Sequence, residues 1–315
     1  MFALLFNFAF AAPIINGEFE TGFPSAIAIG ADFGGPFAIC SANLITPRVV
    51  LTAAHCGADI PLELVVQSGL AFFGSDVTTS TQSVGFEDML VHPEYIELES
   101  EWGGNLGAYD FALLTLAEDA PVEPTLFRIE PLTDSELNST LTSVGFGLTN
   151  PNSQANGVKY SAELTLDAYQ EMFLISYSST NPNNAQICSG DSGGPMYYYD
   201  ESIGQYIQWA VHSWGDAGCA QMSGSTRTDL ISDWILDYVE DVHGSRDLCE
   251  ANGWYANNQC DNFCDEPDPD CNLAAEDENE AAKAGCTTSP TQDLSFWLIP
   301  LIGLMVVRHG KSRQT

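Results

Sequence analysis

Residues 188–195 read Cys-Ser-Gly-Asp-Ser-Gly-Gly-Pro, and this stretch decides how the rest of the chain is interpreted. A serine hydroxyl is a poor nucleophile unless a base accepts its proton and hydrogen-bond donors stabilise the oxyanion that it creates. Glycines around Ser192 allow a sharp turn, so the N–H groups of Gly190 and Ser192 can point to one place. A polar glycine turn between two strands is the alternative, so the choice depends on whether a base and a carboxylate occur elsewhere.

Both partners occur earlier in the chain. His55 lies in Leu-Thr-Ala-Ala-His-Cys at 51–56, and Asp110 precedes the apolar run Phe111–Leu116. An apolar strand can bury the carboxylate beside the imidazole, where it holds the tautomer whose base nitrogen faces the serine. Asp88 is the competing carboxylate, and the strand after Asp110 favours Asp110. The chain order His, Asp, Ser is that of chymotrypsin-type triads and differs from subtilisin-type and α/β-hydrolase triads.

Together these motifs resemble the trypsin/chymotrypsin family of serine endopeptidases over residues 14–243. The resemblance implies an all-β fold of two six-stranded antiparallel β-barrels, with the active site between them and a C-terminal helix. It implies that Ser192 attacks the peptide carbonyl, His55 transfers the proton and Asp110 orients His55, while the amides of Gly190 and Ser192 hold the oxyanion. The rival interpretation is a non-catalytic adhesin or scaffold, although such relatives usually lose a triad residue or the oxyanion glycine.

Activation and two disulfides are also implied by this resemblance. Residues 13–17 read Pro-Ile-Ile-Asn-Gly, which is similar to the mature start of family members, so a freed amine at Ile14 would pair with Asp191. No Lys or Arg precedes Ile14, so a trypsin-like activator is not expected. One family disulfide, in the loop ahead of the nucleophile, has no cysteines here. The implied disulfides are Cys40–Cys56, across the histidine loop, and Cys188–Cys219, beside the primary pocket.

The primary specificity pocket is expected to be uncharged at its floor. Gln186 stands six residues before the nucleophile, where trypsin has an aspartate, so nothing offsets the desolvation of a Lys or Arg side chain. His212 together with Ser189 resembles the pocket of glutamyl-specific relatives, so an acidic preference and a neutral or aromatic preference both stay open. The strand 213–215 resembles the one that pairs with the substrate backbone. The predicted pocket residues are Gln186, Ser189, His212, Ser213, Trp214, Gly215 and Gly224.

The amino-acid composition limits which binding partners and which cellular compartment can be expected. The 315 residues include 43 acidic and 9 basic side chains, a formal net charge of −34, which argues against a nucleic-acid partner. The excess indicates either a solvated acidic surface or a specific cationic partner. Nine cysteines favour an oxidising compartment, and residues 1–12 read as an apolar signal peptide, with a buried N-terminal strand as the alternative. We therefore expect a secreted or cell-surface monomer that acts on proteins or peptides and requires no cofactor.

Residues 249–271 form an acidic cysteine-rich module that is too short to bury a core. Two crosslinks are expected, and three pairings are open. Carboxylates are candidate calcium ligands, but no loop with defined calcium-ligand spacing occurs. Zinc is less favoured, because exported thiols tend to oxidise. The four cysteines are Cys249, Cys260, Cys264 and Cys271, and the aspartates are Asp261, Asp265, Asp268 and Asp270.

The remaining C-terminal segments suggest a helix and a sorting tail. Residues 229–239 resemble the terminal helix of the family, whose apolar side chains, Leu230 among them, are expected to pack on the second barrel. The tail resembles the C-terminal sorting signals of Gram-negative surface proteases, with processing or lipid attachment at Cys286 and membrane contact before processing. A simple membrane tether is the alternative. The tail divides into an acidic linker 272–293, a hydrophobic segment 294–307 and a basic end 308–315.

Overall fold

A computed structural model describes residues 14–80, 82–99, 105–148, 156–255 and 257–271. The predictions for the signal peptide 1–12, the linker 272–293, the segment 294–307, the basic end 308–315 and Cys286 lie outside the described residues.

Apolar strands of the N-terminal half close into a six-stranded antiparallel barrel in the order β2-β3-β4-β9-β6-β5, as the sequence predicts. Its interior is filled by aliphatic side chains such as Ile27, Leu51 and Leu113, none of which is exposed. Because this sheet closes on itself, it has no unpaired edge strand, and its inward-facing apolar residues form the core. The strands are β2 (Ala26–Asp32), β3 (Pro36–Leu44), β4 (Val49–Thr52), β5 (Gly69–Phe73), β6 (Gln82–Val91) and β9 (Ala112–Leu116).

The C-terminal half differs from the predicted six-stranded barrel. It is an eight-stranded antiparallel sheet in the order β1-β11-β10-β14-β15-β16-β13-β12. Two short strands lengthen it, because the N-terminal segment pairs with β11 at one edge and a hairpin turn at Glu171 adds β12 at the other. The strands are β1 (Glu18–Phe19), β10 (Thr140–Gly145), β11 (Tyr160–Thr165), β12 (Ala168–Gln170), β13 (Phe173–Tyr177), β14 (Pro195–Asp200), β15 (Gln205–Gly215) and β16 (Met222–Arg227).

A further hairpin lies ahead of Asp110. Its strands β7 (Ile96–Glu99) and β8 (Asn105–Ala108) pair antiparallel, and the sequence did not predict this hairpin. Helix α1 (Leu62–Ser68) was not predicted either. Among its apolar residues only Val65 is buried, whereas Leu62, Leu64 and Val66 are exposed.

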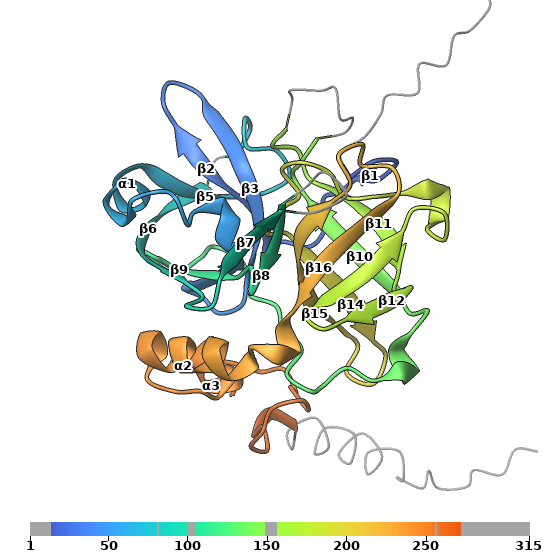
Figure 1. The fold of residues 1–315 in the computed structure, drawn as a ribbon. Helices are drawn as coiled ribbons and strands as arrows, with labels where there is room; N and C mark the ends of the chain where they lie inside the picture. Colours follow the sequence, from blue (N-terminus) through green and yellow to red (C-terminus); the bar gives the residue numbers. More distant parts are fainter. Residues whose placement is uncertain (1–13, 81, 100–104, 149–155, 256, 272–315) are drawn as a thin grey trace, which may run out of the picture. The chain divides into compact units, whose positions relative to one another are not determined.

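The terminal helix α2 (Ser232–His243) packs on the first barrel, so the expectation that it packs on the second was wrong (Figure 1). Ile235 and Val239 are fully buried within the hydrophobic core of the first barrel, and the Tyr238 hydroxyl bonds Thr115 Oγ1 of β9 at 2.7 Å. Leu230 lies in the turn before the helix and is half exposed. After β16 the chain therefore crosses back to cover the barrel formed by its first half.

Four disulfides occur in the described residues. Two of them join the cysteines that the family resemblance implies, Cys40 with Cys56 and Cys188 with Cys219. In the module that follows α3 (Leu248–Asn252), the pairing left open by the sequence is Cys249–Cys264 and Cys260–Cys271. No helix in the described ranges is long and apolar enough to span a bilayer.

Candidate active site

His55 and Asp110 are joined by two hydrogen bonds. His55 sits in the single 3-10 turn after β4, and Asp110 ends the turn that leads into β9. The Asp110 carboxylate is fully buried; one oxygen accepts the His55 backbone N–H at 2.9 Å and the other accepts His55 Nδ1 at 2.8 Å. Ser213 Oγ donates to the second oxygen at 2.6 Å. The competing carboxylate, Asp88, is exposed on β6 and bonds only its neighbour Met89.

Ser192 lies in the same cleft as His55, and the turn around it leaves two amides free. Within the described part of the chain, the N–H groups of Gly190 and Ser192 bond no other protein group. The N–H groups of Asp191, Gly193 and Gly194, by contrast, each donate to a backbone carbonyl. The two free N–H groups are separated by the bonded N–H of Asp191, and in this arrangement both can point to the same anionic oxygen. The Ser192 hydroxyl has no hydrogen bond to the described residues, a common state of serine–histidine pairs before substrate binds.

Two glycines of this turn are required by the backbone. Gly190 and Gly193 have φ of +91° and +79°, a region that other L-residues rarely adopt. A Cβ on Gly193 would lie 2.0 Å from Thr52 Oγ1. Ser41 of β3 holds the turn from the first barrel, because its N–H donates to Ser192 O at 2.8 Å and its hydroxyl to Gly190 O at 2.9 Å. The sequence analysis missed Ser41, whose neighbours in the chain carry no signal for this role.

Asp191 is fully buried and has no ion pair among the described residues. Its carboxylate accepts the backbone N–H groups of Cys188 at 2.8 Å and Gly147 at 2.9 Å. Burial raises the pKa of Asp191 to about 7, although these two bonds act in the opposite direction. The N-terminal segment reaches the same region, because Ile14 is fully buried and Ile15 forms an isolated bridge with Gln186.

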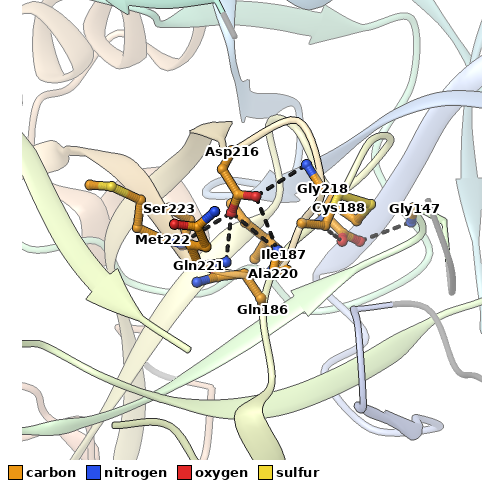
Figure 2. The surroundings of a disulfide bond; sticks show 12 residues. Gly147, Gln186, Ile187, Cys188, Asp216, Gly218, Ala220, Gln221, Met222 and Ser223 are labelled. Atoms are coloured by element: carbon orange, nitrogen blue, oxygen red, sulfur yellow. Dashed lines mark hydrogen bonds between the residues drawn. A yellow bond between two sulfur atoms is a disulfide. The ribbon is translucent and has the colours of Figure 1, made fainter. Parts of the chain in front are cut away.

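Four of the predicted pocket residues, Ser189, Ser213, Trp214 and Gly215, line a cleft of about 400 Å³ together with His55 and Ser192. Its wall beyond β15 is shaped by the Cys188–Cys219 disulfide and by Asp216 (Figure 2). The Asp216 carboxylate accepts backbone N–H groups of four residues, Gly218, Ala220, Gln221 and Met222. Although burial opposes its ionisation, these bonds outweigh that effect and lower the pKa of Asp216.

The other three predicted pocket residues do not line the cleft. Gln186 is fully buried, and its amide oxygen accepts the hydroxyl of Ser223 at 2.5 Å and the N–H of Ile187 at 3.0 Å. Gly224 is covered, because a Cβ there would lie 2.2 Å from the Trp214 indole. His212 is fully buried between two hydroxyls, with Nε2 2.6 Å from Ser143 Oγ and Nδ1 3.0 Å from Ser225 Oγ.

The environment of His212 does not support the acidic preference that the sequence left open. Burial lowers the pKa of His212 to about 3, although a hydrogen bond to the backbone carbonyl of Pro195 acts in the opposite direction. The imidazole is therefore neutral near pH 7 and turned toward hydroxyls outside the cleft, so it cannot donate as an imidazolium to an acidic side chain.

Asn181 connects β11, β13 and the segment just before Gln186. Its Oδ1 accepts the N–H of Thr165 in β11 at 2.7 Å and the hydroxyl of Ser176 in β13 at 3.0 Å. Its Nδ2 donates to Ala185 O at 2.8 Å, next to Gln186. Only 6% of Asn181 is exposed. Hydrogen bonds of a buried amide therefore fasten the segment behind the pocket without a crosslink.

Replacing this amide should destabilise the protein. Asn181→Ala leaves the Thr165 N–H and the Ser176 hydroxyl buried without an acceptor, and each loss costs about 1–3 kcal/mol. We expect the free energy of unfolding to fall by roughly 3 kcal/mol, measured by urea denaturation, together with a higher KM. Asn262→Ala, which removes an exposed amide from the cysteine module, should change stability by less than about 0.5 kcal/mol. Equal stability of the two variants would contradict this role.

No calcium geometry is found in the described part of the module. Asp261, Asp268 and Asp270 are each nearly buried and accept local N–H groups. The only described group of three or more candidate ligand atoms within 4.8 Å of one another is that of Cys40, His55 and Cys56, whose cysteines are crosslinked. Calcium binding thus stays a prediction without structural support.

A sequence profile of the trypsin family matches residues 17–235, more than half of the chain. The chain belongs to this family, whose members are serine endopeptidases. It is similar to venom serine protease 34 of Apis mellifera, with 27% identity over 221 residues that cover 66% of this chain and 53% of the relative. It is also similar to a trypsin of Saccharopolyspora erythraea, 28% identical over 211 residues that cover 63% and 83% of the two chains. Trypsin 5G1 of Aedes aegypti is 27% identical over 215 residues, 63% of this chain and 74% of the relative. This chain thus spans about half the length of the venom protease.

Proposed function

We propose that this protein is an exported serine endopeptidase that cleaves peptide bonds through an acyl-enzyme intermediate. One observation carries the proposal: the chain Ser213–Asp110–His55 opens onto the cleft that contains Ser192 and the two free amides. A hydrogen-bonded imidazole, a serine hydroxyl and unoccupied backbone donors in one cleft are the parts that acyl transfer requires.

In the proposed reaction, Ser192 Oγ bonds to the substrate carbonyl carbon while His55 Nε2 takes the hydroxyl proton. The carbonyl oxygen becomes an oxyanion that the N–H groups of Gly190 and Ser192 stabilise. The C–N bond then breaks, and His55 gives its proton to the leaving amine. Water repeats the sequence on the ester and releases the carboxylate product. Asp110 accepts a hydrogen bond from the Nδ1–H group of His55 throughout the reaction.

Labelling with a fluorophosphonate probe tests the proposal directly. The purified form that begins at Ile14 should react covalently, with one label on Ser192 located by peptide mass spectrometry. Absence of label on a folded protein would favour the alternative of a non-catalytic scaffold built on the same fold. Labelling at a different serine would show that the cleft is not the reactive site.

Activation is proposed to require a free amine at Ile14. The buried Asp191 lacks a cationic partner in the described chain, and the adjacent N-terminal segment can supply one after cleavage. An unpaired buried charge is costly, so pairing would order the oxyanion turn that contains Asp191.

This activation step predicts a pH dependence of stability in the uncleaved form. The pKa of Asp191 is about 7 when folded and about 4 when unfolded, so the folded state binds more protons between these values. Stability should therefore fall as pH rises from about 4 to 7, by up to roughly 4 kcal/mol, and stay level above pH 7. Urea denaturation of the form beginning at Ala11 should show this fall. Asp191→Asn in the same form should remove it, and cleavage to Ile14 should reduce it. A fall of equal size in all three would contradict the pairing.

The primary pocket is proposed to take neutral side chains. Gln186 lies beneath the cleft with its oxygen occupied by Ser223 and Ile187, and His212 is neutral and turned away. Neither can offset the desolvation of a charged side chain. We thus expect cleavage after neutral residues, and neither trypsin-like nor glutamyl-type specificity.

Export and maturation remain proposals that rest on the disulfides and on the terminal segments. Four crosslinks in the described chain are typical of an oxidising compartment. Processing or lipid attachment at Cys286 is expected after transient membrane contact of residues 294–307. Mass spectrometry of the mature C terminus tests this proposal, and an intact Thr315 would contradict it.

A further inference from the structure

The substrate cleft is acidic beyond the primary pocket. Apart from His55, its charged lining residues are Glu97 of β7 and Asp216 at the end of β15, and no described Lys or Arg lines it. Asp216 stays ionised because backbone N–H groups lower its pKa. Glu97 is exposed on the side of the first barrel. The cleft thus presents one carboxylate from each half of the catalytic domain.

The pKa of Tyr95, which also lines the cleft, reflects the nearby negative charges. Its pKa is raised to about 12, first by burial and then by the negative charges of Asp110, Glu97 and Asp59. A phenol near several carboxylates loses its proton less readily because a further anion would be repelled. The negative potential is therefore present inside the cleft and is not confined to the outer surface of the protein.

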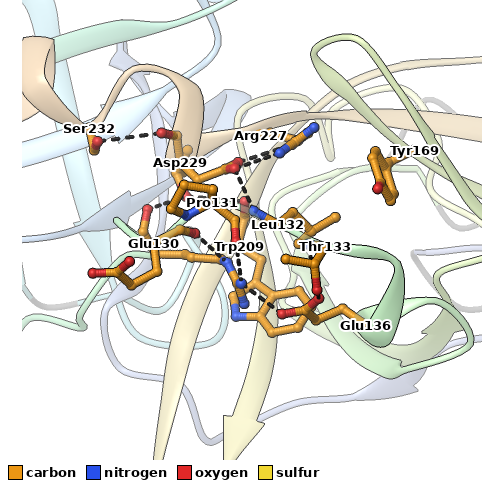
Figure 3. A network of polar contacts seen from close by, with 12 residues as sticks. Glu130, Pro131, Leu132, Thr133, Glu136, Tyr169, Trp209, Arg227, Asp229 and Ser232 are labelled. Carbon is orange, nitrogen blue, oxygen red and sulfur yellow. Dashed lines mark hydrogen bonds and ion pairs between the residues drawn. The ribbon is translucent and has the colours of Figure 1, made fainter.

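Apart from His55, no basic side chain of the described residues lies in the cleft to offset this potential. Arg227 is an example: it forms a buried pair with Asp229 and stacks over Tyr169, at the end of β16 (Figure 3). The others are held in the same way. Arg48 pairs with Glu87, Arg128 with Glu136, Arg246 with Asp233 and Asp237, and Lys159 Nζ donates to the carbonyls of Gly22 and Phe23.

We propose that this cleft selects substrates that carry Lys or Arg two to four residues before the scissile bond. This inference rests on the proposed peptidase function. A substrate strand that pairs antiparallel with residues 213–215 runs from Ser213, beside the reacting bond, toward Asp216. Its second to fourth residues before the cut thus approach Asp216 and Glu97, whereas the residue at the cut enters the neutral pocket above Gln186.

The expected effect of these two carboxylates on kcat/KM is moderate. Two unit charges about 7 Å apart at an effective dielectric of about 40–80 interact by roughly 1 kcal/mol, which is about fivefold in kcat/KM. A net charge of −34 adds a long-range attraction that raises the association rate of cationic peptides. Both contributions weaken with salt, since the Debye length falls from about 10 Å at 0.1 M to about 3 Å at 1 M.

The test compares three peptides that are identical, with Phe before the cut, except for Lys, Gln or Glu at the third residue before it. We expect kcat/KM to fall in the order Lys, Gln, Glu, by about three- to tenfold at each step in low salt. At 1 M NaCl the Lys to Gln ratio should approach one. Equal rates for Lys and Gln peptides in low salt would overturn the proposal. Failure to hydrolyse the Gln peptide at all would instead overturn the peptidase assignment, and this proposal with it.

Two charge-matched variants separate the cleft from the overall charge. Glu97→Gln should lower the Lys to Gln ratio about two- to threefold. Glu240→Gln makes the same change in net charge on the exposed side of α2 and should leave the ratio unchanged. Identical ratios for the two variants would show that only the overall charge acts, and would overturn the assignment of this selectivity to the cleft.

Discussion

Ser192→Ala is expected to lower kcat on a peptide amide by about 10⁶-fold, the largest effect of any single replacement. The variant has no hydroxyl at this position to form the acyl-enzyme bond, and Ser213, another serine of the cleft, already donates its hydroxyl to Asp110. The N–H groups of Gly190 and Ser192 persist in the variant, so a residual rate of about 10³–10⁴ over water should remain. Progress curves with active-site-titrated wild-type protein as the reference give the ratio.

Ser189→Ala is the matched control for this replacement. Ser189 lines the same cleft three residues earlier in the chain, outside the proposed nucleophile position. It should change kcat by less than about tenfold, because it touches only the pocket rim. If Ser192→Ala keeps more than 1% of the activity while its melting curve is unchanged, Ser192 is not the nucleophile.

Asp110→Asn is expected to lower kcat by about 10⁴-fold. Both Asp110 oxygens accept N–H groups of His55, one from the backbone and one from Nδ1. Because the backbone N–H of His55 is always a donor, the amide oxygen of the variant stays opposite it and the NH₂ group faces Nδ1. The imidazole then carries its proton on Nε2, so the nitrogen that faces Ser192 can no longer accept a proton.

Asp88→Asn provides the comparison, since Asp88 is the other carboxylate that the sequence offers for this role. It is exposed on β6, and we expect kcat to be unchanged within about twofold. The pH–rate profile and the fluorophosphonate labelling rate should be measured for both variants. A loss in Asp88→Asn as large as that in Asp110→Asn would remove Asp110 from its proposed role.

Motifs whose chemistry depends on neighbours in the chain could be predicted from the sequence. The nucleophile turn, the histidine loop and the strand after Asp110 each combine a functional side chain with a local backbone requirement, such as the positive φ of Gly190. The closed first barrel was expected from the family resemblance, because closure joins distant strands. The motifs themselves are local, so they can be identified without knowledge of the tertiary contacts.

Features that depend on contacts between distant parts of the chain could not be predicted from the sequence. Asn181 and Ser41 are ordinary polar residues in their own segments, and only the fold brings them to Thr165 and Ser192. Likewise His212 matched a residue pattern of glutamyl-specific relatives, but its ring turns toward Ser143 and Ser225. A residue type at a given spacing does not determine the direction of its side chain or the dielectric around it.

The position of α2 has a consequence for when the protease can work during its own synthesis. The first barrel completes its apolar core only with Ile235 and Val239, which are made after both triad partners and the nucleophile. A growing polypeptide that ends before these residues leaves that barrel uncovered, although His55, Asp110 and Ser192 have all been translated. We therefore expect a chain that ends before Ile235 to lack a stable first barrel and, with it, the proposed peptidase activity.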